Sequence, residues 1–224
     1  MILAHPTFDR MRSINEGKIE VLVVENKNMF SKYIAEINSQ IQGNEGYFKL
    51  YKNNEELPLS FVDLIINPFD INPNCKSVLS TVYSKLKTIL LDENHYQSTN
   101  VILQSVENYM SECAEYLDSY LMISEGSNSS SLVKLVDPKF ILSKDSLLEC
   151  ICDYLRIVKQ YTQIELFIFV NLKTFLNRED LRLLYDFLFM NKIPVLLLEN
   201  CIHELIECET LCIIDSDLCE IGNY

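Results

Sequence analysis

Acidic side chains near the ends of expected strands are the first groups in this sequence that could do chemistry. Two or three converging carboxylates can bind Mg²⁺ and cut a phosphodiester, so a divalent-metal phosphodiesterase or nuclease is one hypothesis. The candidates are Glu25, Asp63, Asp70, Glu199, Asp215 and Asp217. No His, Lys or Glu stands at a diagnostic spacing beside them, and no Ser, His or Cys arrangement is typical of a nucleophile. We therefore expect that the protein is not an enzyme.

A second set of acids lies in a stretch without any base. Residues 92–125 hold seven acids and no Lys or Arg. Ca²⁺ relieves repulsion among hard oxygen ligands and accepts irregular carboxylate cages. A solvated acidic face is the alternative, and the residues alone favour it. The calcium ligands that local charge suggests are Glu112, Glu115, Asp118 and Glu125.

The turn after the first expected strand lacks the glycines of a phosphate-binding loop. This turn comprises residues 25–32 and contains no glycine. Backbone amides cannot wrap closely around a phosphate when every position carries a side chain, so a nucleotide loop is not supported. Lys32 could still contact a phosphate, or it could be a solvated lysine on a helix.

The formal charge of −13 argues, taken alone, against nucleic acid. Its distribution allows one basic face, because residues 71–91 hold three bases and no acid. These bases are Lys76, Lys85 and Lys87.

Cysteine content and hydropathy indicate the compartment. Most of the eight Cys lie among apolar residues, which favours reduced, buried thiols over disulfides. A zinc site at Cys201, His203, Cys208 and Cys212 is a less favoured alternative, because no Cys-x-x-Cys pair is present. No apolar segment approaches the roughly 20 residues that span a bilayer. We expect a soluble cytoplasmic protein without a membrane segment.

The elements that must position these residues form an α/β pattern. Leu166 to Val170 is an unbroken apolar segment, and Ile193 to Glu199 is a second, with one helix-length segment between them. This spacing predicts a right-handed crossover between buried parallel strands. Periodicity between residues 72 and 161 is helical. We predict a first part of an α/β domain at 1–71, a rigid helical insertion or leg at 72–161, and the second part of the α/β domain at 162–224.

The two apolar strands also carry a family resemblance. Phe167-Ile-Phe-Val-Asn-Leu-Lys-Thr-Phe-Leu-Asn-Arg-Glu-Asp180 and Lys192-Ile-Pro-Val-Leu-Leu-Leu-Glu199 resemble the CRISPR-associated ring-forming proteins of type II-A systems, accessory factors in spacer acquisition. Val24-Glu25, Phe30-Ser-Lys32, Leu132-Val-Lys134 and the segment 145–159 agree with this family.

The resemblance implies a head like a P-loop ATPase that has lost its nucleotide site, and a calcium-stabilised homotetrameric ring. Ends of double-stranded DNA would pass through its basic hole. Expected partners are the spacer-integration complex and the RNA-guided nuclease of the same system. The lysines that match the family pattern are Lys32, Lys134, Lys139 and Lys159.

The chain departs from the family pattern at two places. Gln163-Ile-Glu165 stands where relatives can carry a lysine cluster, and Asp137-Pro138 replaces an expected glycine. Either change reduces positive potential or alters the turn. DNA affinity is therefore expected to be weaker, or to depend on Lys76, Lys85 and Lys87 instead.

Overall fold

The computed structural model describes residues 1–15, 17–117, 128–143 and 145–222. The chain divides into two compact units. We call Met1–Asn72 together with Leu142–Tyr224 the α/β unit, and Pro73–Ile141 the helical unit. Within the described ranges, no helix has the length and apolar character that a membrane crossing requires.

The α/β unit is built on a six-stranded sheet of order β10-β9-β3-β8-β7-β6. Its strands are β3 (Ile19–Val24), β6 (Val62–Ile65), β7 (Leu166–Val170), β8 (Val195–Glu199), β9 (Glu209–Ile214) and β10 (Glu220–Gly222). Neighbours from β9 to β6 are parallel, and β10 is antiparallel to β9. The predicted parallel pairing of β7 with β8 is confirmed, and the chain is a mixed α/β protein as expected.

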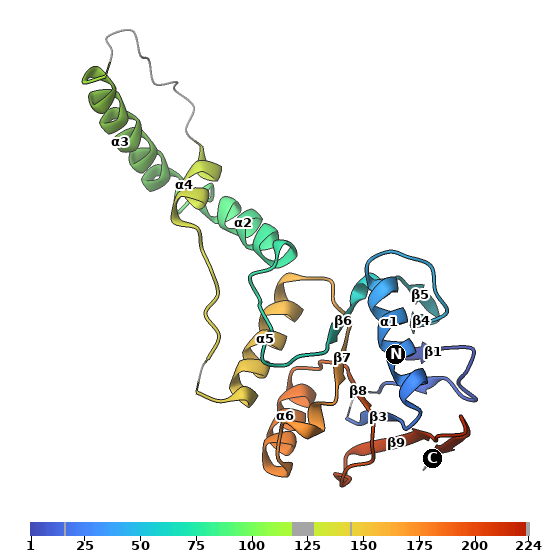
Figure 1. Cartoon of the computed structure of the whole chain (residues 1–224). Helices are drawn as coiled ribbons and strands as arrows, with labels where there is room; N and C mark the ends of the chain where they lie inside the picture. Colours follow the sequence, from blue (N-terminus) through green and yellow to red (C-terminus); the bar gives the residue numbers. More distant parts are fainter. Residues whose placement is uncertain (16, 118–127, 144, 223–224) are drawn as a thin grey trace. The chain divides into compact units, whose positions relative to one another are not determined.

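Three helices cover the two faces of this sheet: α1 (Lys27–Ile41), α5 (Leu147–Tyr161) and α6 (Arg178–Met190). In Figure 1, α1 lies on one side of the sheet, and α5 and α6 lie on the other. β3, β7 and β8 are buried at every position, because alternate side chains point to opposite faces and both faces are covered. Leu22, Ile168 and Leu196 pack in one cluster with Tyr33 and Ile37 of α1.

A smaller antiparallel sheet accompanies the large one, with strand order β2-β1-β4-β5. Its strands are β1 (Ile2–Ala4), β2 (Arg12–Ser13), β4 (Lys49–Lys52) and β5 (Glu55–Leu57). β4 and β5 form a hairpin whose turn residues Asn53 and Asn54 both have positive φ, a conformation that asparagine tolerates well. Short 3₁₀ helices precede β6 at Leu59–Phe61 and follow β7 at Leu172–Thr174.

The helical unit contains α2 (Lys76–Leu90), α3 (Tyr96–Glu115) and α4 (Ser129–Val136). Its two ends are joined by Asn74, which donates to the carbonyl of Phe140 (2.9 Å) and accepts from the amide of the same residue (2.8 Å). Helix α3 has few buried side chains, whereas Ile102, Tyr109 and Met110 are exposed. This helix therefore presents an apolar face that the described part of the unit does not cover.

Helix α5 belongs to the α/β unit, so the helical unit ends at Ile141 and not at the predicted residue 161. Ile151, Leu155 and Val158 of α5 are buried, and the hydroxyl of Tyr154 donates to Asp63 of β6 (2.7 Å). The sequence could not distinguish this helix from the insertion, because an amphipathic pattern does not say which surface its apolar face meets.

Candidate nucleic-acid interface

The seven lysines predicted to contact DNA are divided between the two units. Lys32 on α1 is exposed, and Lys159 near the end of α5 is half-buried. The other five belong to the helical unit: Lys76, Lys85, Lys87, Lys134 and Lys139. The structure therefore provides two sets of basic side chains, one on each unit.

Within the helical unit, helix geometry sorts the three lysines of α2. Lys76 and Lys87 are eleven positions apart, which is close to three full turns, so they share one side of the helix. Lys85 is nine positions from Lys76 and faces the opposite side. Only two of these three lysines can therefore meet the same phosphate backbone.

The remaining two lysines of this unit differ in their surroundings. Lys134 on α4 is exposed, while Lys139 forms an ion pair with Asp137 at 2.6 Å. Asp137 adopts a left-handed conformation after α4 and also accepts a hydrogen bond from Tyr83 (3.2 Å). The hydrogen bond and charge of Lys139 lower the pKa of Asp137, so the carboxylate offsets part of this predicted basic site.

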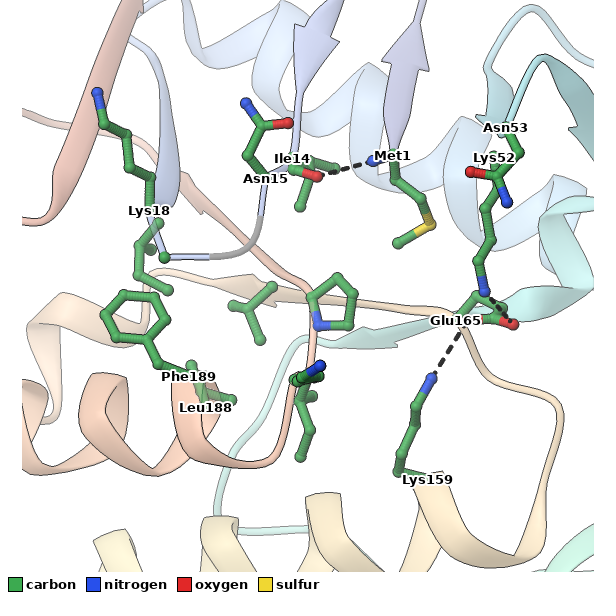
Figure 2. A pocket seen from close by; sticks show the side chains of 16 residues that line it. Met1, Ile14, Asn15, Lys18, Lys52, Asn53, Lys159, Glu165, Leu188 and Phe189 are labelled. Carbon is green, nitrogen blue, oxygen red and sulfur yellow. Dashed lines mark hydrogen bonds and ion pairs between the residues drawn. The ribbon is translucent and has the colours of Figure 1, made fainter.

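In the α/β unit, Lys159 belongs to a cluster of three charged groups. Glu165 binds Lys159 at 3.2 Å and Lys52 at 2.9 Å, and Figure 2 shows the two lysines approaching it from opposite sides. Burial alone would raise the pKa of Glu165, but the two lysines together lower it below its usual range. Sequence reasoning missed Lys52, which is brought to Lys159 by the hairpin of β4 and β5.

The turn at the carboxyl end of β3 holds no phosphate loop. Asn26 caps α1 by accepting a hydrogen bond from Met29 N (3.1 Å), and its amide group donates to the carbonyl of Ser216 (3.0 Å). The cap satisfies one of the free amides that a phosphate would use at this helix N-terminus. This geometry agrees with the glycine-free sequence of the turn.

A buried ionic cluster lies where β7 and β8 end. The side chain of Lys173 is 3% exposed, and its ammonium group donates to Glu209 Oε2 (2.8 Å) and to the carbonyl of Glu204 (2.8 Å). Glu209 also accepts from the hydroxyl of Tyr185 (2.5 Å). Glu199 is fully buried and accepts from the backbone amide of Lys173 (3.1 Å). The cluster connects four elements in the interior of the unit: the 3₁₀ helix after β7, α6, β8 and β9.

Two of the other strand-end acids, Asp63 and Asp215, are separately engaged. Asp63 accepts from Tyr154, and Asp215 accepts from the amides of Asp217 and Cys219 (2.9 and 2.8 Å). In the part of the chain that the structure describes, no three acidic, His or Cys side chains gather as metal ligands. The carboxylates of the phosphodiesterase hypothesis do not converge there.

The predicted metal ligands are only partly described. Glu112 and Glu115 are exposed near the end of α3, one turn apart, while Asp118 and Glu125 lie outside the described residues. Of the zinc alternative, Cys201 and His203 are in contact (Sγ to Nε2, 3.4 Å), and Cys212 is buried in β9. These four zinc candidates do not form a ligand group.

Glu199 predicts a pH dependence of stability. Burial raises the pKa of Glu199 to about 7, although the backbone hydrogen bond and the charge of Lys173 oppose the rise. Its Oε2 has no hydrogen-bond partner among the described residues. Its ordinary pKa is 4.5, so the folded protein binds this proton more tightly than the unfolded chain. The contribution of Glu199 to the free energy of unfolding is then fully present below pH 4.5. It is lost as the pH rises to 7, by at most about 3 kcal/mol.

Glu199→Gln replaces the titrating carboxyl group with an amide that does not titrate. The variant is expected to unfold at a higher urea concentration than the parent protein at pH 8, with a small difference at pH 5. The quantity to compare is the difference between the variant and the parent protein at each pH. Burial also raises the pKa of Glu20 to about 7, and this group titrates in the same way in both proteins. An equal difference at both pH values would show that Glu199 does not titrate in this window.

The fold and site define a class of protein: a mixed α/β protein with a mostly parallel sheet, an additional helical unit, and no glycine in the turn after β3 that would form a phosphate loop. The family model described as CRISPR-associated protein (Cas_Csn2) matches residues 40–218, and the chain belongs to this family. No curated protein matches the sequence.

Among solved structures, the chain is similar to a putative ABC transporter ATP-binding protein from Pyrococcus furiosus. The two share 12% sequence identity over 93% of this chain and 94% of that chain, with a TM-score of 0.38.

Proposed function

We propose that this protein is a non-enzymatic accessory factor of CRISPR adaptation that binds the ends of double-stranded DNA. The observation that carries the proposal is membership of the CRISPR-associated family over residues 40–218. That membership supports a role beside the other proteins of a CRISPR system. In this proposal the partners are the spacer-integration complex and the RNA-guided nuclease of the same system.

The DNA contacts in this proposal are lysine to phosphate. Such contacts do not read sequence, and they weaken with salt because DNA releases counterions when the protein binds. Lys32 and Lys134 support the proposal most directly, since both are exposed. Lys139 and Lys159 must exchange Asp137 and Glu165 for phosphate, which is expected to make binding weak.

The α/β unit in this proposal is a head related to P-loop ATPases that has lost nucleotide binding, and the helical unit is its leg. The parallel strands and the capped, glycine-free turn at Asn26 support this assignment. The turn leaves no close backbone cradle for a triphosphate.

Ring formation is proposed through self-association into a homotetramer. The apolar face of α3, with Ile102, Tyr109 and Met110 exposed, supports an interface because exposed apolar patches on water-soluble surfaces mark contact sites. Calcium would bind near the end of the same helix, where Glu112 and Glu115 are candidates. The other two candidates chosen from the sequence, Asp118 and Glu125, lie outside the described residues. The cation would reduce repulsion among these acids as subunits assemble.

Solution mass and topology-dependent DNA binding test the proposal together. We expect a tetramer in calcium, a smaller species after chelation, and retention of linear but not closed circular DNA in a gel shift, because a ring loads over an end. Light scattering coupled to gel filtration measures the mass.

A monomer that ignores linear DNA in calcium buffer would contradict the proposal. The alternative function, a divalent-metal phosphodiesterase, makes the opposite prediction about the DNA itself. It requires that DNA is cut in Mg²⁺ and that Asp215→Asn abolishes cutting without loss of folding.

A further inference from the structure

A pocket of about 340 Å³ lies at the amino ends of β3 and β8, beside the residue that precedes β7. Apolar groups form much of its wall, including Ile19 and Val195 at the strand starts and Phe189 near the end of α6. This volume is near the lower end of the roughly 300–1,000 Å³ of small-molecule sites. A small ligand fits such a space, whereas the body of a DNA duplex does not.

The polar lining of this pocket is strongly basic although the protein carries a net charge of −13. Four lysines contribute: Lys18, Lys52, Lys159 and Lys192. Of the lining residues that the structure describes, Glu165 is the single carboxylate, and it pairs with Lys52 and Lys159. Among the described residues, Lys18 and Lys192 take part in no ion pair, so the described part of the lining carries an excess of positive charge.

We propose that this pocket binds a small phosphate ester with an apolar or aromatic body, and that Glu165 competes with the phosphate for Lys52 and Lys159. The lysines supply charged donors for the phosphate, and the apolar wall around Phe189 accepts the organic part. Figure 2 shows Glu165 between Lys52 and Lys159, which is the position a phosphate would take between them. Glu165 therefore acts as an internal anion whose displacement accompanies binding.

The test uses the isotope-labelled full chain at low salt and without DNA, because Lys159 is shared with the proposed DNA interface. Adenosine 5′-monophosphate, inorganic phosphate and adenosine are titrated separately, and amide signals of the pocket residues are followed by NMR. Adenosine 5′-monophosphate is expected to bind more tightly than either of the other two probes.

Two substitutions move the affinity for adenosine 5′-monophosphate in opposite directions. Glu165→Gln frees both lysines and should tighten binding by roughly three- to tenfold, and Lys52→Gln should weaken it by roughly tenfold. Glu56→Gln is the matched control. This substitution also frees a lysine from its ion pair, Lys49, but both residues line a different pocket. It should leave the affinity unchanged.

Three results would overturn the inference. The first is that adenosine binds as tightly as adenosine 5′-monophosphate, which would remove the role of the lysines. The second is that inorganic phosphate binds as tightly as adenosine 5′-monophosphate, which would remove the role of the apolar wall. The third is unchanged affinity in both Glu165→Gln and Lys52→Gln. If Glu165→Gln does not fold, Lys52→Gln alone decides, since the side chain of Lys52 is 43% exposed and does not belong to the hydrophobic core. None of these results depends on whether the protein binds DNA ends.

Discussion

Lys173→Met is expected to lower the free energy of unfolding by about 3–5 kcal/mol, the cost of removing one partner of a buried ion pair. Methionine has nearly the length of lysine, so the effect comes from the missing charge and not from a cavity. The carboxylate of Glu209 is fully buried and would lose the ammonium group at 2.8 Å. The carbonyl of Glu204 would lose its donor as well.

The environment of Glu209 makes this loss severe. Tyr185 and the amide of Ile206 still donate to Glu209 (2.5 and 2.9 Å), but no positive charge would remain beside it. Glu199, which already has a raised pKa, lies close enough to Glu209 to add repulsion. The folded variant must therefore either bind a proton at one carboxylate or keep an uncompensated charge in its interior.

Urea unfolding followed by circular dichroism measures the change. Lys49→Met is the control, because Lys49 and Glu56 form an ion pair at 2.6 Å whose side chains are about half exposed, and such pairs contribute roughly 0–1 kcal/mol. The double variant Lys173→Met with Glu209→Gln should recover part of the loss. Similar losses for Lys173→Met and Lys49→Met would mean that the buried pair contributes no more than a surface pair.

The strands of the large sheet could be predicted from the sequence because their signal is local. Leu166 to Val170 and Ile193 to Leu198 are short continuous apolar segments, which are typical of strands covered on both faces. The chain between them is long enough for a helix and too long for a hairpin. Parallel pairing followed from these two facts alone.

The burial of Lys173 could not be predicted in the same way. Lysine is among the residues least often buried, and its partner Glu209 is 36 positions away. Asn171 turns the chain there with a φ of 54°, and its side chain accepts from the amide of Asn200 (3.0 Å). The segment 167–180, which contains Lys173, was noted in the sequence because it resembles the family. The role of Lys173 depends on contacts with distant residues that only the fold brings together.

The candidate interface was predictable as a set of residue types and not as an arrangement. Lys159 was chosen from the sequence, but Lys52 is bound to the same Glu165 across a separation of 113 positions. The departure at Glu165 was expected to reduce positive potential, and the geometry gives that expectation a specific form. The carboxylate of Glu165 binds both lysines. The positive charge that is available to an incoming anion therefore depends on whether the anion can displace this carboxylate.

Replacing Lys32, Lys134, Lys139 and Lys159 together by Gln is expected to reduce affinity for linear duplex DNA on the order of 10²–10³-fold at low salt. Each lysine that no longer binds a phosphate removes a charged hydrogen bond and the release of about one counterion. The slope of log affinity against log salt concentration should become shallower by roughly 0.9 for each phosphate that the variant leaves without a lysine. The slope tests the mechanism more strictly than the affinity, since a misfolded variant loses affinity without following this relation.

A control with the same change in net charge separates local contacts from the overall field. Its substitutions are Lys27→Gln, Lys49→Gln, Arg178→Gln and Arg182→Gln. This control should bind somewhat more weakly at low salt but keep the salt slope of the parent protein, because it removes charges that do not touch phosphate. If both quadruple variants show the same affinity and the same slope, the four lysines do not bind phosphate, and Lys76 with Lys87 on their shared side of α2 become the next pair to replace.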